Sequence, residues 1–166
     1  MRLARLIQIL GYLGLVPFLV PIWFVLNHQS LLGLSPSRLF VVYSGVILTF
    51  LAGSIWGTIV NRPLNSPANY AEPDFRHVEV PIGLAASFAV ISNLIALSVW
   101  LVILISDNYD FAALFALLTG FVIVLWMELG WNLQYSASLK NKYLSLRWKL
   151  TLIVTTCHIV MLFLTY

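Results

Sequence analysis

The residues of this chain that could carry chemistry are a few polar side chains set within long apolar stretches. Glu128 lies in one such stretch, and Arg147 begins another that contains His158. A carboxylate and an imidazole can take up and release protons or bind a cation, and a guanidinium can pair with the carboxylate. Because ionisable groups are costly in lipid, each of the three is a candidate functional residue.

The spacing of Glu128 and Arg147 predicts an ion pair. Glu128 lies 18 residues after Asp110, which is roughly 27 Å along a helix and places it near the far edge of a bilayer core. Arg147 enters the next apolar stretch at the same edge. We therefore expect the two side chains to tie two helices together. Proton carriage or ligand binding by Glu128 is the alternative.

A polar stripe follows the last apolar stretch. Its members fall within about 80° of one another on a helical wheel at 100° per residue, and they are Arg147, Thr151, Thr155, His158 and Thr165. Lipid would leave such a stripe unsatisfied, so it has to face protein or water. The structural interpretation of His158 is a neutral imidazole bonded to an amide or hydroxyl on another helix. Proton relay is one alternative, and ligation of a haem or metal is another, although no second ligand lies in register.

Motifs of catalysis are absent from the sequence. It contains no Gly-rich phosphate loop, no HExxH, no G-x-S-x-G and no CxxC, and Cys157 is its single cysteine. The run EPDFRHVE, residues 72–79, has carboxylates and a histidine that could hold a divalent cation, but such a run is equally typical of a solvated loop. We predict no catalytic residue, no cofactor, no metal site and no enzymatic activity.

The elements that must position these side chains are membrane-spanning helices. The chain of 166 residues is 61% apolar and 9% charged, whereas soluble domains are about a quarter charged. A spanning helix needs about 20 mostly apolar residues, and backbone groups in lipid must be satisfied within the segment. The sequence predicts an all-α integral membrane protein, a five-transmembrane-helix bundle forming one domain over 1–166. The predicted spans are residues 6–26, 39–60, 81–105, 111–130 and 148–164.

The first span is expected to be retained in the protein. It follows Arg2 and Arg5 as a signal peptide would, but it is longer than the apolar core of a signal peptide and no small-x-small cleavage site follows it. Pro17 and Pro21 lie inside it and predict kinks, which membrane helices tolerate.

The basic residues predict the orientation of the bundle. Eight of the nine lie at the N-terminus, in the loop 61–80 or between residues 140 and 149, and Arg38 alone lies on the other side. The positive-inside rule then places the N-terminus and the loop 61–80 in the cytoplasm and the C-terminus outside. The net charge of +3 is explained by this bias, so we expect the lipid bilayer as a partner and no nucleic acid.

The stretch YSGVILTFLAGSIWG, residues 43–57, predicts a seam of close helix packing. Every fourth position is small, and these positions are Gly45, Thr49, Gly53 and Gly57. Small residues let helix backbones approach closely in lipid. The third span offers a matching small face with Ala89 and Asn93, and Asn93 needs a hydrogen-bond partner such as Thr49 or Ser92. Packing within the chain is the structural interpretation; a partner protein or a binding cavity are the alternatives.

Three segments together carry a resemblance to a known family. They are LGYLGLVPF (residues 10–18), the stretch 43–57 and YLSLRWKLTL (residues 143–152). The chain resembles a poorly characterised inner-membrane family, named after a domain of unknown function, that includes transmembrane protein 69. The resemblance implies a small polytopic protein of an inner membrane with no assigned reaction. Ile55 stands where the family often has a basic or polar residue, which argues against an anion site there, and the loop 61–80 matches poorly.

These observations leave three functional hypotheses. The first is a non-catalytic protein of the bacterial inner membrane, an accessory subunit or assembly factor of a larger membrane complex such as a respiratory one, with other membrane subunits as partners. The second is a carrier or channel for protons or a small solute, acting as a homo-oligomer. The third is an intramembrane enzyme that acts on a lipid, for which the sequence shows no polar cluster.

Overall fold

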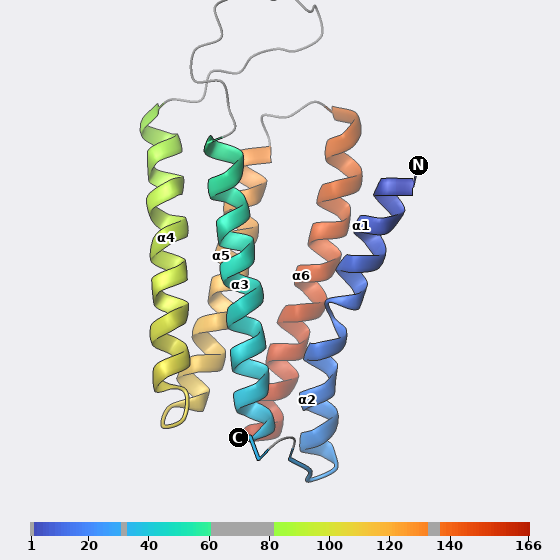
Figure 1. The fold of residues 1–166 in the computed structure, drawn as a ribbon, viewed down its shortest axis with the longest axis vertical. Helices are drawn as coiled ribbons and strands as arrows, with labels where there is room; N and C mark the ends of the chain where they lie inside the picture. Colours follow the sequence, from blue (N-terminus) through green and yellow to red (C-terminus); the bar gives the residue numbers. More distant parts are fainter. Residues whose placement is uncertain (1, 31–32, 61–81, 133–136) are drawn as a thin grey trace, which may run out of the picture.

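The fold is a bundle of α-helices (Figure 1). The computed structural model describes residues 2–30, 33–60, 82–132 and 137–166. Its helices are α1 (Arg2–Leu13), α2 (Val16–Leu26), α3 (Pro36–Val60), α4 (Ile82–Ile105), α5 (Asp110–Asn132) and α6 (Ala137–Thr165). The predicted loop 61–80, with its possible cation-binding run, lies outside the described residues.

Five segments of the described chain are long and apolar enough to cross a membrane. They are Gln8–Leu26, Pro36–Gly57, Gly83–Ile105, Asp110–Leu129 and Leu144–Thr165. The predicted all-α bundle of five transmembrane helices is therefore confirmed. The helix α6 begins before the predicted span 148–164, and its apolar part begins at Leu144. Hydropathy does not detect the more polar first turns of the helix.

The first span is made of two helices rather than one kinked helix. The chain breaks at Gly14, three residues before Pro17, whose ring provides no N–H for the carbonyl four residues earlier. Pro21 lies inside α2 and does not end this helix. The hydroxyl of Tyr43 in α3 donates a hydrogen bond of 2.9 Å to the carbonyl of Gly14. This bond holds the break against the centre of the bundle.

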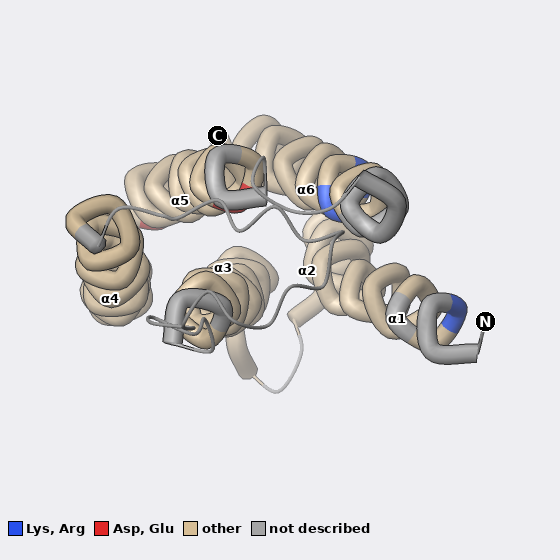
Figure 2. The backbone as a smooth tube through the Cα atoms, turned by 90° about the horizontal axis from the view of Figure 1, so that it is seen from above, with Lys and Arg blue, Asp and Glu red and all other residues tan. Residues whose placement is uncertain are grey.

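The helix α3 lies at the centre of the arrangement. It packs against α2, α4 and α5, while α6 packs against α5 and α2. Figure 2 shows α3 on the inner side of an arc formed by α4, α5, α6 and the α1–α2 pair. Side chains of α2, α5 and α6 consequently meet in front of one face of α3, and α4 borders another face.

The outer surface of the bundle is apolar, unlike that of a water-soluble protein, and its interior is a mainly apolar core that also holds a few polar side chains. Large apolar side chains such as Phe50, Trp126 and Phe163 are 71%, 71% and 82% exposed, whereas Glu128 and His158 are buried. Lipid solvates the apolar surface, and polar groups have to find partners inside.

The end of the bundle that carries the C-terminus is closed by two contacts. Arg38 at the start of α3 forms an ion pair with Asp107, which lies between α4 and α5. The hydroxyl of Tyr166 accepts a hydrogen bond of 2.7 Å from the backbone N–H of Phe111. That N–H is one of the groups that the first turn of α5 cannot satisfy by itself. Both contacts fix chain ends and turns outside the apolar core.

Candidate functional site

The predicted ion pair between α5 and α6 is present. Arg147 Nε donates to Glu128 Oε2, and the two residues are only 8% and 5% exposed. They lie near the last residues of one span and the first residues of the next. Each charge is neutralised by the other at this depth, and the pair links α5 to α6.

His158 lies deeper on α6 and is fully buried. Its Nδ1 is 2.8 Å from the carbonyl oxygen of Val154, one turn earlier on the same helix. A carbonyl can only accept, so Nδ1 carries the proton and Nε2 presents a lone pair. We expected the imidazole to bond to a group on another helix. At Nδ1 it bonds instead to the carbonyl of Val154 on its own helix.

Three phenylalanine rings surround the imidazole. Phe40 of α3, Phe121 of α5 and Phe18 of α2 have their ring centroids 4.7, 5.3 and 6.1 Å from that of His158. We call these three residues the phenylalanine cage. Four different helices thus meet around one side chain. No spacing in the sequence indicates this convergence, because it depends on which faces of the helices meet.

The rest of the polar stripe is partly buried. Thr151 is 4% exposed, and Thr155 is half-buried with its hydroxyl donating 2.9 Å to the carbonyl of Leu152 on its own helix. Buried stripe residues therefore run along α6 from Arg147 to His158. Among the described residues, no three His, Cys, Asp or Glu side chains come together.

The glycine ridge of α3 is divided into two parts. A Cβ built on Gly45 would lie 2.8 Å from Ile103 Cδ1 and 2.9 Å from Val99 Cγ1 of α4, so the two helices touch closely there. No described atom lies within 4 Å of a Cβ built on Gly53 or Gly57. The predicted seam exists around Gly45 and is open towards the other end of the ridge.

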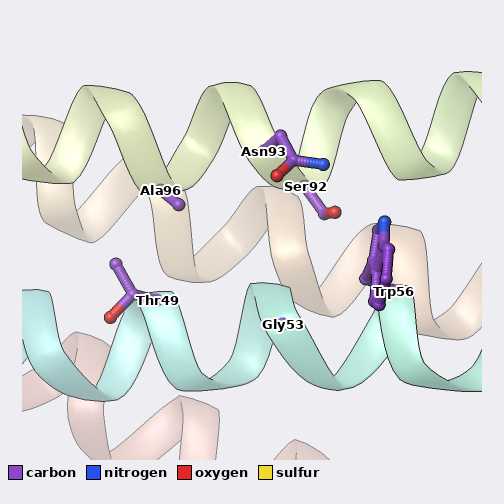
Figure 3. A pocket seen from close by; sticks show the side chains of 6 residues that line it. All are labelled: Thr49, Gly53, Trp56, Ser92, Asn93 and Ala96. Carbon is purple, nitrogen blue, oxygen red and sulfur yellow. The ribbon is translucent and has the colours of Figure 1, made fainter.

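The open part forms a groove between α3 and α4 (Figure 3). Its volume is about 320 Å³, and it is lined by Thr49, Gly53, Trp56, Ser92, Asn93 and Ala96. In Figure 3 the indole nitrogen of Trp56 points towards α4, and the side chains of Ser92 and Asn93 reach into the space from the opposite wall. Three predicted packing residues therefore border a groove instead of a tight seam. We call this space the α3–α4 groove.

Among the described residues, Asn93 bonds to neither Thr49 nor Ser92, the two partners expected for it. Asn93 Nδ2 donates 2.9 Å to the carbonyl of Ala89 in its own helix, and Ser92 donates 3.0 Å to the same carbonyl. Thr49 shares its hydroxyl proton between the carbonyls of Gly45 and Val46. The helices are held apart at this level, so each polar group turns back to its own backbone. The Asn93 side chain stays exposed in the middle of a span.

Comparisons with known proteins place the chain in a family and no further. Neither the curated proteins nor the solved structures contain a match. The expected membership of a family named after a domain of unknown function is confirmed. A family model described as "Protein of unknown function (DUF3429)" matches residues 3–163, nearly the whole chain, and the protein therefore belongs to this family.

Proposed function

We propose that this protein is a non-catalytic accessory subunit or assembly factor of a larger complex, such as a respiratory one, in a bacterial inner membrane. The N-terminus faces the cytoplasm in this proposal. Eight of the nine basic residues lie at the N-terminus, in the loop 61–80 or between residues 140 and 149, which are all on one side of the proposed topology. The observation that carries the proposal is the α3–α4 groove. It is a surface feature within the membrane-spanning region, lined by small and polar side chains and by Trp56.

The chemistry of the groove favours a transmembrane helix as its occupant. Gly53 and Ala96 form parts of its two walls, so a partner backbone can approach closely and gain van der Waals contact. Asn93 keeps its amide oxygen and one N–H available, and a polar side chain at this depth is stabilised by a hydrogen bond that lipid tails cannot provide. The expected partner is a helix with a small-residue face and one hydrogen-bonding side chain.

Filling the groove should remove the partner and leave the bundle intact. Gly53→Leu places a side chain where no described atom lies within 4 Å of the Cβ, so the free energy of unfolding should change little. Overpacking of a helix interface costs about 1–3 kcal/mol, which corresponds to a loss of affinity of roughly fivefold to 150-fold. The measurement is the amount of partner that co-purifies in mild detergent and co-migrates on native gels.

A matched control is available on a lipid-facing position of α5. Ala116 is exposed, so Ala116→Leu enlarges a small residue by a similar amount outside the groove and should leave the partner bound. A wild-type protein that always migrates alone, or only as a homo-oligomer, would refute the docking role. Equal loss of partner in both variants would refute the placement of the interface in the groove.

A second function, transport of protons or a small solute, is supported by the buried stripe on α6. His158 Nε2 makes no hydrogen bond to the described protein although it is fully buried. Five spans in one copy cannot form two equal inverted repeats, so a carrier of this kind would act as a homo-oligomer.

Flux measurements in liposomes test this second function. Proton flux should fall in His158→Leu, which removes the lone pair from the stripe, and in Glu128→Gln, which removes the carboxylate at its end. Leu152→Ala is a suitable control because Leu152 is 64% exposed on the same helix. Flux that is unchanged in both stripe variants, or absent in the wild type, would eliminate transport along this path.

A further inference from the structure

The hydroxyl of Ser44 in α3 behaves differently from those of four other serines of α3 and α4. Hydroxyls of serines in membrane helices usually bond to a backbone carbonyl three or four residues earlier. The serines of α3 and α4 that do so here are Ser54, Ser87, Ser92 and Ser98. Ser44 of α3 is fully buried, and its hydroxyl makes no hydrogen bond to any described residue. Its side chain is thus available to a ligand in the core.

The neighbours of Ser44 on α3 place it beside the phenylalanine cage. Phe40, one turn earlier, has its ring 4.7 Å from that of His158. Leu48, one turn later, packs against Gly120, the residue before Phe121. Phe121 in turn has its ring 5.3 Å from that of His158. Ser44 lies between two residues whose contacts lead to His158, and all three share the buried face of α3.

The second buried polar atom without a described partner is His158 Nε2. Because Nδ1 donates to the carbonyl of Val154, the neutral ring can only accept at Nε2. The hydroxyl of Ser44 can both donate and accept. A ligand shared by these two atoms must donate one hydrogen bond to Nε2 and can accept another from Ser44. A buried polar group without a hydrogen-bond partner destabilises the folded protein, which favours occupation of the site.

We propose that Ser44 and His158 together bind one water molecule at the centre of the bundle. Buried waters characteristically bond to polar groups that the protein leaves unsatisfied. The phenylalanine cage supplies neutral walls, and the charges of Glu128 and Arg147 already neutralise each other, so a neutral protic molecule fits better than an ion. The water links α3 to α6 by hydrogen bonds and continues the polar stripe past His158. This site is independent of the α3–α4 groove and of the docking function.

The test is solid-state NMR of the protein in lipid bilayers, with ¹⁵N-labelled histidine. The ring signals of His158 are assigned by their loss in His158→Leu. Magnetisation transferred from water protons should reach the non-protonated Nε2 in the wild-type protein. Ser44→Ala removes one of the two anchors and should reduce this transfer several-fold. Ser54→Ala removes a hydroxyl that is bonded to its own helix and should leave the transfer unchanged.

Three results would overturn the proposal. The first is an absence of water transfer to Nε2 in the wild-type protein. The second is a direct contact between the Ser44 hydroxyl proton and Nε2, which would mean that the two side chains bond to each other. The third is a transfer that Ser44→Ala leaves unchanged, which would remove Ser44 from the site. The wild-type measurement decides the first two results even if the Ser44 variant folds poorly.

Discussion

Replacing Arg147 with methionine is expected to lower the free energy of unfolding by about 3–5 kcal/mol, the usual effect of removing one partner from a buried ion pair. Glu128 is 5% exposed, so its carboxylate would lose both its countercharge and its hydrogen-bond donor. It would then either stay charged in the core or take up a proton without a partner, and both states are costly. The measurement is reversible unfolding in mixed micelles with increasing amounts of a denaturing detergent.

The exposed ion pair at the other end of the bundle is the control. The side chains of Arg38 and Asp107 are 40% and 50% exposed, and solvent screens such pairs, so Arg38→Met should cost less than about 1 kcal/mol. The double variant Glu128→Leu with Arg147→Met removes both charges and should recover most of the loss. Equal effects of Arg147→Met and Arg38→Met would contradict a structural role for the Glu128–Arg147 pair.

The parts of this fold that the sequence predicts are those that lipid imposes. Bilayer thickness fixes the length of each apolar run, so all five spans could be recognised without a structure. Depth also predicts the Glu128–Arg147 pair, because opposite charges at one level of neighbouring helices have few other partners. Hydropathy marks only the apolar part of α6, so the predicted span 148–164 does not include the more polar first turns of this helix.

The candidate site depends on tertiary register, which the sequence does not contain. Gly45 and Gly53 look alike along α3, but Gly45 faces Val99 and Ile103 whereas Gly53 faces the side of α4 that carries Ala96. Large residues opposite one glycine fill the space, and small residues opposite the next leave a groove. The residues on the neighbouring helix therefore decide whether a small residue is closely packed or borders a groove. The same reasoning explains why the phenylalanine cage was not predicted.

The cage itself should be a major source of packing energy, and Phe18→Ala tests it. Phe18 is 1% exposed, and its ring lies 4.9 Å from Tyr43, 5.6 Å from Phe40 and 6.3 Å from Phe121. In water-soluble cores a Phe-to-Ala change costs about 3–5 kcal/mol, the sum of a transfer part and a cavity part. Helices of a membrane protein stay in lipid when they separate, so mainly the cavity part remains. We expect a loss of about 2–3 kcal/mol.

A phenylalanine on the outside of the bundle is the control for Phe18→Ala. Phe163 of α6 is 82% exposed, so its ring is surrounded by lipid in both the folded and the separated state. Phe163→Ala should therefore change the free energy of unfolding by no more than about 0.5 kcal/mol. The two variants remove the same atoms, which means that any difference between them reports packing alone. If both lose the same amount, helix association is not driven by this aromatic centre, and the cage around His158 is not a rigid part of the protein.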